Sequence, residues 1–273
     1  MKTRALIIAA MITGTAFSTT AMAQQGGVGG KFNLKTTVNL YGKVDLKRNA
    51  IAHFGNVKLK NSRIGGNADL TLHSEVNGPV LVEKGGRLGH GTFGMYNSQI
   101  TGNVTANLKA ISKKITVGQD AKVFVASVDM YGQSKINGSL GITAVGNTGE
   151  IKTGKESTLL VSSLQMKGSS INGNAKLNLN SKVGKITLGQ RAKAYISSVS
   201  MMDSTVSGPM NVTSQVQLRN VNLGKDAHFA AGAVVLNNAN ISGGVDIRSN
   251  VSVSGNVDLA SGADVALGSF QIM

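Results

Sequence analysis

The stretch ISGGVDIRSNVSVSGNVDLASGADVAL, residues 241–267, carries an aliphatic residue at every sixth position. Its main series is Ile241, Ile247, Val253, Leu259 and Val265. A second series, of smaller residues, lies four positions after each member of the first and consists of Val245, Val251, Val257 and Ala263. An α-helix repeats at about 3.6 residues and a strand at about 2, so an interval of six indicates a larger repeating unit.

Two sequence words recur along most of the chain and define this unit. The first is x-I-x-G, found as RIGGN, QITGN, KINGS, SINGN, TVSGP and NISGG, with Ile or Val at positions 64, 100, 136, 171, 206 and 241. The steps between its copies are 36, 36, 35, 35 and 35. Between them lies a second word, such as TVGQDAK, TLGQRAK and NLGKDAH. Regular self-similarity of this kind is the signature of a repeat architecture.

The second word falls midway between copies of the first. The repeat interval therefore divides into two halves of about 17–18 residues, and each half divides into three hexads. We predict an all-β, single-domain parallel β-helix: a three-sided β-solenoid in which each half-interval of about 17–18 residues is one coil. About 13 coils at about 4.8 Å would form a rod roughly 65 Å long. The aliphatic series points inward, and Gly and Asn occupy the corners. The series is interrupted at Gly94, Ala106, Ser112, Asp129 and Ser200.

The word L-G-x-x-A-x, as in LGQRAK and LGKDAH, resembles the hexapeptide repeat of left-handed β-helices. The looser alternation in VDLASGADVALG, residues 257–268, is similar to bactofilins. That second resemblance implies a right-handed helix that polymerises end to end. The resemblance covers about residues 38–270 and implies a triangular parallel solenoid, with left-handed winding slightly favoured over right-handed. Bactofilins are typically cytoplasmic, and the N-terminus of this chain departs from that pattern.

The N-terminal residues predict export. Lys2 and Arg4 precede an apolar run, and Ala21-Met22-Ala23 has the small-x-small pattern of signal-peptidase cleavage. We predict a signal peptide at 1–23, a flexible Gly-rich leader at 24–31, irregular first coils or a cap at 32–63, and a regular solenoid at 64–273. The exported protein would be extracellular or at the cell surface, with the periplasm as an alternative. No later stretch is long and apolar enough for a transmembrane anchor.

The chain is strongly basic, with 28 Lys and Arg residues against 13 Asp and Glu. Such a surface favours polyanions such as an anionic polysaccharide or extracellular DNA. Lys122, Lys176 and Lys193 each occupy the last position of a hexad and are candidate polyanion contacts. The alternative is that the charge keeps a rod soluble and prevents its sheet edges from pairing.

The sequence predicts neither an enzyme, a cofactor nor a metal site. It has no cysteine, and its four histidines do not show metal-ligand spacing with one another. His73 and His90 are separated by about one predicted coil, so they would stack near each other as surface corner residues. No coil carries an insertion long enough for the projecting loop of the hexapeptide acyltransferases, and acidic residues are scarce.

Two features predict association of the chain with itself. A column of large residues at steps of 35 would either face outward for lateral association or fill a wide corner of the core; its members are Tyr96, Tyr131, Met166, Met201 and Leu236. The sequence also ends in GSFQIM, so Phe270, Ile272 and Met273 would leave an apolar end on the last coil. An uncapped end coil favours head-to-tail stacking.

We therefore expect a secreted structural protein that self-assembles head to tail into extracellular filaments, such as a biofilm matrix or surface fibre. The alternative is a secreted adhesin or binding module whose basic solenoid faces bind polyanions or glycans.

Overall fold

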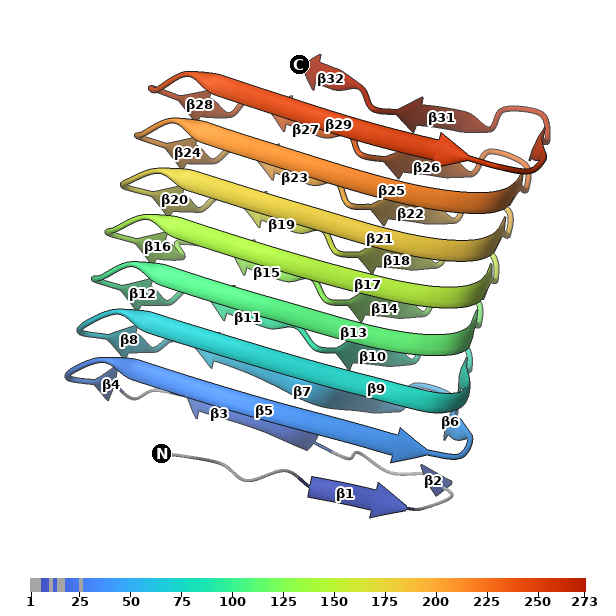
Figure 1. Cartoon of the computed structure of the whole chain (residues 1–273), viewed down its shortest axis with the longest axis horizontal. Coiled ribbons are helices and arrows are strands. Elements are labelled where there is room, and N and C mark those ends of the chain that lie inside the picture. Colours follow the sequence, from blue (N-terminus) through green and yellow to red (C-terminus); the bar gives the residue numbers. More distant parts are fainter. Residues whose placement is uncertain (1–5, 10–11, 14–17, 25–26) are drawn as a thin grey trace.

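The chain folds as a parallel β-solenoid of stacked coils (Figure 1). The structure is a computed structural model that describes residues 6–9, 12–13, 18–24 and 27–273, with side chains from residue 28 onward. All regular elements in these ranges are strands, and every pair of neighbouring strands is parallel. The predicted all-β solenoid is therefore confirmed. The predicted signal peptide falls in the sparsely described N-terminal part and lies outside the residues whose side chains are described.

One coil corresponds to the whole repeat interval, so that stacked positions differ by 35 or 36 in sequence number, which is twice the predicted coil length. Ile136 pairs with Ile100 on one side and with Ile171 on the other. Along the longest strands, Ile142 pairs with Ala106 and Leu177. The two halves of the repeat interval thus lie on opposite sides of one coil instead of stacking on each other. The stack has about seven coils in place of the predicted thirteen, and a spacing of about 4.8 Å makes it about 34 Å high.

Three parallel sheets run along the stack. The long sheet contains one extended strand per coil and short strands at its corner. Its strands are β1 (Leu6–Ala9), β2 (Ile12–Thr13), β5 (Phe32–Tyr41), β6 (Val44–Leu46), β9 (Ala68–Val82), β13 (Val104–Val117), β17 (Leu140–Thr153), β21 (Ala175–Leu188), β25 (Met210–Leu223), β29 (Val245–Val253) and β30 (Val257–Leu259).

The folded sheet has two limbs in most coils. Its first limb contains β10 (Arg87–His90), β14 (Lys122–Val125), β18 (Thr158–Val161), β22 (Lys193–Ile196), β26 (His228–Ala231) and β31 (Asp264–Leu267). Its second limb contains β11 (Phe93–Tyr96), β15 (Val128–Tyr131), β19 (Leu164–Lys167), β23 (Val199–Met202), β27 (Val234–Asn237) and β32 (Phe270–Ile272). Strand β7 (Ile51–Lys60) supplies both limbs in the first coil, and β3 (Ser18–Gln24) pairs with it.

The short sheet closes each coil with a two-residue strand. Its members are β4 (Gly27–Val28), β8 (Arg63–Ile64), β12 (Gln99–Ile100), β16 (Lys135–Ile136), β20 (Ser170–Ile171), β24 (Thr205–Val206) and β28 (Asn240–Ile241). We number the coils by these strands, so that coil 1 begins at β4 and coil 7 at β28. Coil 1 therefore starts inside the predicted leader and follows the same three-sheet path as the later coils through residues 32–63.

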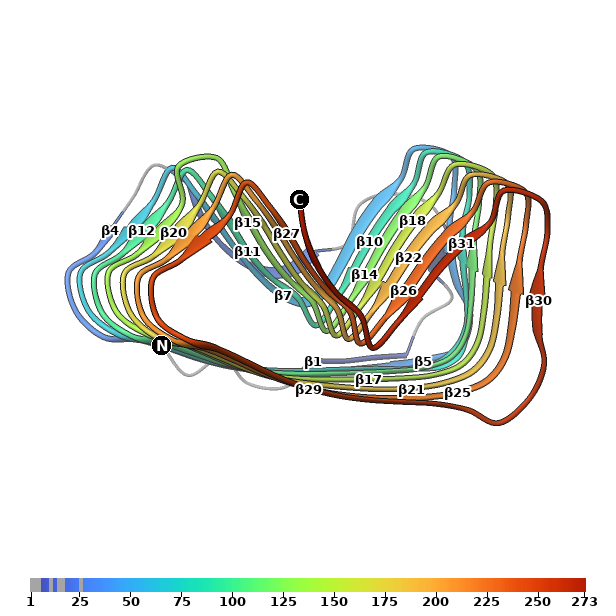
Figure 2. The ribbon, with the colours of Figure 1, turned by 90° about the horizontal axis from the view of Figure 1, so that it is seen from above.

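The three sheets confirm the predicted three-sided β-helix, although its cross-section departs from a triangle because the folded sheet bends inward (Figure 2). Its two limbs form a V whose vertex points toward the long sheet, and this V is the groove of the molecule. The vertex residues have left-handed backbone, for which glycine or a small residue is suited. The column consists of Gly55, Gly91, Ala126, Ser162, Ser197, Gly232 and Gly268, with φ between 47° and 66°.

Small residues on the long sheet make room for this vertex. Ser181 Oγ accepts a 2.8 Å hydrogen bond from Ser197 Oγ, and Ser162 Oγ donates to the carbonyl of Asn180 at 2.9 Å. Ser162 of the vertex occupies the space that a side chain at Gly146 would need, since a Cβ there would lie 2.7 Å from Ser162 Oγ. The core is therefore pinched at its middle into two lobes.

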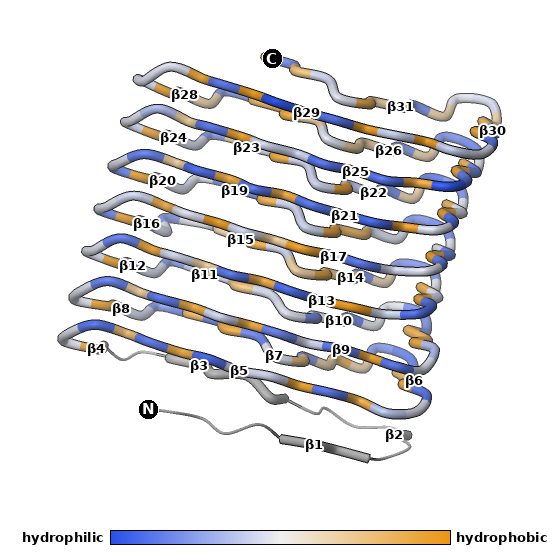
Figure 3. Tube along the Cα trace, viewed as in Figure 1, coloured by the Kyte–Doolittle hydropathy of each residue, from blue (hydrophilic) through white to orange (hydrophobic). Residues whose placement is uncertain are grey.

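Both lobes are filled by aliphatic columns that run through the coils. Along the long sheet hydrophobic and hydrophilic residues alternate, as the colours of Figure 3 show, and the apolar ones are the buried ones. In β21, Leu177, Leu179 and Val183 are buried while the residues between them face outward, apart from Ser181, which meets the vertex. Two hexads thus form one flat strand with no corner between them. The period of six therefore correctly predicted which side chains face inward on the long sheet, although it did not predict the phase of the second limb or the length of a coil.

Candidate functional site: the open end and the groove

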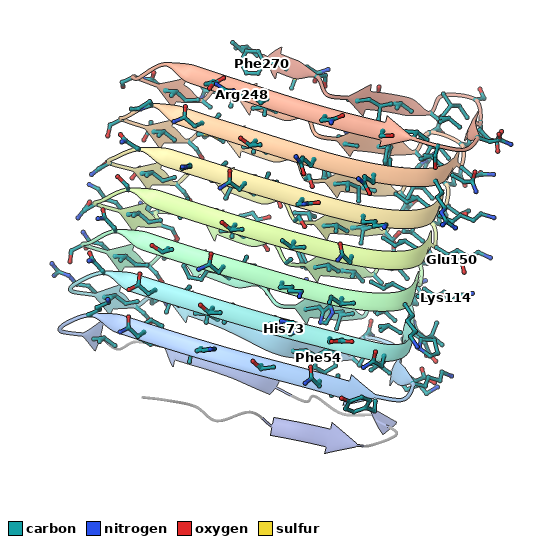
Figure 4. The ribbon with its side chains drawn as sticks, in the orientation of Figure 1. Phe54, His73, Lys114, Glu150, Arg248 and Phe270 are labelled. Atoms are coloured by element: carbon teal, nitrogen blue, oxygen red, sulfur yellow. The ribbon has the colours of Figure 1, made fainter. Side chains whose placement is uncertain are left out.

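The last coil presents an unfinished core. Ile272 is 70 % exposed, whereas Leu236, its partner in the coil below, is 4 % exposed. Phe270 is 47 % exposed, whereas its partner Val234 is 1 % exposed. The main difference within each pair is that a further coil covers the lower residue. Phe270 lies on this top coil in Figure 4.

The apolar surface of coil 7 extends along the long sheet as well as the folded sheet. Its exposed large side chains are Val245, Val257, Leu259, Leu267, Phe270, Ile272 and Met273. Strands β28, β29, β31 and β32 are the last members of their sheets, so each has an unpaired edge. An exposed parallel edge with apolar side chains beside it is a template for adding another strand. The predicted residues Phe270 and Ile272 therefore lie on one surface, whereas Met273 follows Ile272 and continues the outward column of Met202 and Asn237.

The predicted lateral column is divided by the structure. The register places Met130 over Met95 and under Met166, and the column continues through Met201 and Leu236. These side chains are at most 4 % exposed and belong to the core. The step between coils 3 and 4 along this column is 36 rather than 35, so Tyr131 is paired with Lys167 and not with Met166. Met166, Met201 and Leu236 are thus unable to form an outward-facing surface.

Tyr96 and Tyr131 do face outward, into the groove. Their rings stack with centroids 5.7 Å apart, and Lys58 Nζ lies 5.0 Å from the Tyr96 ring centroid. The Tyr131 hydroxyl donates a hydrogen bond to the Gln165 amide oxygen. Burial raises the pKa of the Tyr96 hydroxyl to about 12 and also raises the pKa of Tyr131, so both phenols stay protonated at neutral pH.

The three predicted polyanion contacts do not lie on one face. Lys122 and Lys193 begin strands of the first limb and share one outward column with Arg87 at the rim of the groove. Lys176 lies on the long sheet, between Gly141 and Asn211. The long sheet also carries ion pairs, such as Lys114 Nζ with Glu150 Oε2 at 3.0 Å, which lie at the right-hand edge of Figure 4.

His73 and His90 do not stack in a column. His73 is on the outer face of β9, whereas His90 is fully buried in the first limb. His90 Nδ1 lies 2.6 Å from Ser74 Oγ, and Nε2 lies 3.2 Å from the carbonyl oxygen of Ile111. A carbonyl only accepts, so Nε2 carries the proton and Nδ1 accepts from the serine. Burial lowers the pKa of His90 to about 4.

Three of the five interruptions of the hexad series mark the groove, whereas Ala106 and Ser112 are buried on the long sheet. Gly94, Asp129 and Ser200 belong to one column, which also contains Gln165 and Val235 and faces into the groove from the second limb. The left-handed vertex residue shifts the phase of the second limb, so Met95 and Met130 point inward instead. Ser112 has a different role, since it replaces an aliphatic residue in the core and its hydroxyl has no hydrogen-bond partner.

Asp129 is the unusual member of this groove column. It is 7 % exposed, and its Oδ1 has no hydrogen-bond partner among the residues that the structure describes. Burial raises the pKa of its carboxyl to about 7, since a charged carboxylate is poorly solvated there. No sequence pattern indicated this group beyond the break in the series.

Within the described residues, no cluster of three or more His, Cys, Asp or Glu side chains is arranged to hold a metal ion. The same part of the chain contains no helix with the length and hydropathy to span a membrane. The resemblance to hexapeptide-repeat proteins and bactofilins is supported only at the level of a parallel β-solenoid. No family model, curated protein or solved structure matches the chain.

Proposed function

We propose that the protein is a secreted structural subunit that stacks head to tail into extracellular filaments. The observation that carries the proposal is the open core of coil 7. Apart from Met273, its exposed apolar side chains stand in columns whose members in coil 6 are buried. A subunit that places its first coil on this surface would continue the same columns and the same hydrogen-bond ladders.

Coil 1 is the matching surface. Its strands β5, β6 and β7 pair on their lower edges with β1, β2 and β3, all of which end at or before Gln24. Cleavage after Ala23 would remove β1, β2 and nearly all of β3. The lower edge of coil 1 would then be free to pair, so processing would couple export to assembly and keep the precursor from polymerising.

The residue columns fit across such a junction. Following the register, Val245 belongs to the column of Phe32, and Leu259 to that of Leu46. Ile272 belongs to the column of Leu59. Each contact would therefore join aliphatic or aromatic side chains. Burying such a side chain fully is worth about 1.5–3 kcal/mol, and those of coil 7 are roughly half exposed, so each contributes about 1 kcal/mol.

The geometry of this junction gives an open assembly. The top of one subunit contacts the bottom of the next, and the strands keep their direction. Such a heterologous contact that does not close produces a filament. End-to-end polymerisation is also what the resemblance to bactofilins implies. A biofilm matrix or surface layer is the setting that the predicted signal peptide favours.

The alternative, an adhesin whose basic faces bind polyanions, has narrower support. Arg87, Lys122 and Lys193 share one column, in which Thr158 separates the two lysines, and Lys176 lies on another sheet.

The assembly mechanism is tested with residues 24–273 and the double variant Phe270→Lys/Ile272→Lys. Placing two ammonium groups in the junction would leave buried, unpaired charges, so we expect the variant to remain monomeric in sedimentation velocity while its far-UV circular dichroism stays that of a β protein. The matched control is Gln271→Lys, because this neighbouring side chain belongs to the outward groove column. Growth by the double variant equal to that of the wild type would contradict the proposal, as would equal inhibition by the control.

A further inference from the structure

The lower part of the groove contains a cavity of about 500 Å³, spanning coils 1 to 3. Volumes between about 300 and 1,000 Å³ are typical of small-ligand sites. Its floor is formed by His53, Asn56 and Lys58 of coil 1, and Phe124 and Asp129 of coil 3 line its upper part. It is distinct from the open end, which lies at coil 7.

Two glycines keep the cavity open. Gly89 and Gly94 occupy facing limbs of coil 2, where the next coil has Phe124 and Asp129. A Cβ on Gly89 would lie 2.1 Å from Asn56 Nδ2, and one on Gly94 would lie 3.0 Å from Tyr96 Cε2. Any side chain at Gly89 would therefore displace the floor, and one at Gly94 would push the tyrosine wall. Coil 2 contributes no side chain of its own at these two positions.

The cavity has one buried acceptor and a cationic rim. Asp129 Oδ1 is buried and has no hydrogen-bond partner in the described part of the chain, and the position beneath Asp129 in its column is Gly94. Burying a polar atom without a partner is unfavourable, so a ligand that donates a hydrogen bond there would recover this cost. At the rim, Arg87 and Lys122 are exposed and form no ion pair within the described residues.

The remaining walls are aromatic. Phe124, Tyr96 and Tyr131 are half-buried and line the cavity. Their hydrocarbon surfaces suit the C–H face of a sugar ring, whose hydroxyls are the donors that a carboxylate needs. The two cations suit a ligand that also carries a negative charge.

We propose that this cavity binds a uronic acid residue, with a ring hydroxyl donating to Asp129 and the ligand carboxylate paired with Arg87 and Lys122. The ligand would be either a free hexuronate or a residue of an acidic polysaccharide lying along the groove. This site does not rest on the proposed filament, because all of its lining residues come from coils 1 to 3 of a single subunit.

The test is isothermal titration calorimetry on residues 24–273 carrying Phe270→Lys/Ile272→Lys, so that assembly contributes no heat. D-Glucuronate and D-galacturonate are the probes, D-glucose is the neutral comparison, and tetragalacturonate tests the polymer. We expect at least one uronate to bind at least ten-fold more tightly than glucose. Tighter binding of the tetramer than of the monomer would identify a polysaccharide as the source, and equal binding would identify the free sugar.

Hydrogen bonds to charged groups contribute about 1.5–3 kcal/mol, so Arg87→Gln, Lys122→Gln and Asp129→Asn should each weaken uronate binding by about ten-fold or more. Lys193→Gln is the matched control, because it lies in the same column two coils above Lys122 and outside the cavity. We expect it to leave the affinity unchanged. Equal binding of glucose and uronate, no binding of either, or an equal loss in the Lys193 variant would overturn the assignment. Binding of a single-stranded oligonucleotide with the same dependence on Arg87 and Lys122, and no uronate binding, would also overturn it.

Discussion

Replacing Asp129 by Asn should change the pH dependence of stability by a predictable amount. The carboxyl has a folded-state pKa of about 7 against an ordinary value of 3.8, because burial disfavours its charged form. Between these two values the unfolded chain has released the proton and the folded chain still holds it. The folded state therefore binds more protons there, and the free energy of unfolding falls as pH rises through this window.

The magnitude follows from the difference between the two pKa values. About three pH units at 1.36 kcal/mol each amount to roughly 4 kcal/mol of stability lost by the wild type between pH 4 and pH 8. An asparagine amide does not titrate in this range. We therefore expect the stability of Asp129→Asn relative to wild type to rise by about 4 kcal/mol from pH 4 to pH 8, with most of the change complete by pH 7.

The assay is urea unfolding followed by circular dichroism at pH 4, 5, 6, 7 and 8. It uses the assembly-deficient double variant as background, and the comparison is the difference between Asp129→Asn and its parent at each pH. Asp258→Asn is the control, because Asp258 is an exposed residue of β30. A difference that stays constant from pH 4 to pH 8 would refute the assignment of a raised pKa to a buried Asp129. So would an identical pH dependence in the control.

Three further predictions concern His90, a stacked glycine and the length of a coil. Burial lowers the pKa of His90 to about 4 from 6.5, so its folded form stays neutral and the free energy of unfolding falls by roughly 3 kcal/mol as pH drops from 6.5 to 4. The variant His90→Val, which copies Val125 of the next coil, should lose this pH dependence in the same urea titration. If the variant retains the pH dependence, another group is titrating. A Cβ on Gly184 would lie 2.1 Å from the Gly149 carbonyl oxygen, so Gly184→Ala should lower the free energy of unfolding by about 1–3 kcal/mol. The control Gly141→Ala should not, because its Cβ would approach no atom closer than 3.8 Å. Equal urea midpoints for the two variants would contradict the close stacking of Gly184 on Gly149. The double variant Asn178→Cys/Thr213→Cys, with both cysteines on adjacent strands, should form a disulfide under mild oxidation, as measured by mass spectrometry. The double variant Asn178→Cys/Tyr195→Cys should not. The reverse result would support a coil of about 17–18 residues instead.

The sequence indicates the solenoid because the inward-facing positions recur in phase over most of the chain. It does not distinguish a coil made of half the repeat interval from one made of the whole interval, because both halves share the same inward rhythm. The available signal was the strict alternation of two different words. Ile136 of one word stacks only on Ile100 and Ile171 of the same word, so the repeat of identical words sets the coil length.

The groove was harder to predict from the sequence than the solenoid. Its vertex depends on left-handed backbone at positions filled by Gly, Ala or Ser, including Ala126 and Ser162, and this column has no single residue type. The breaks in the aliphatic series at Gly94, Asp129 and Ser200 were visible, but their common outward direction follows only from the pairing register. For the same reason, the sequence placed Tyr131 and Met166 in one column although Met166 is stacked on Met130.

The exposed end was easier to predict from the sequence, because Phe270 and Ile272 are large apolar residues in a terminal strand. Their exposure results from the lack of a coil above them in the structure, and both belong to columns that are buried in the coil below. The residues that would meet them, such as Leu59 in coil 1, could be named only after the register was known.

The most direct test of head-to-tail stacking is electron microscopy of residues 24–273 after incubation at neutral pH. Continuation of the ladders predicts long, unbranched filaments of uniform width, with a repeat of about 4.8 Å along the axis and a subunit rise of about 34 Å. Isolated particles about one stack high at every protein concentration would contradict the proposal that coil 7 of one subunit binds coil 1 of the next.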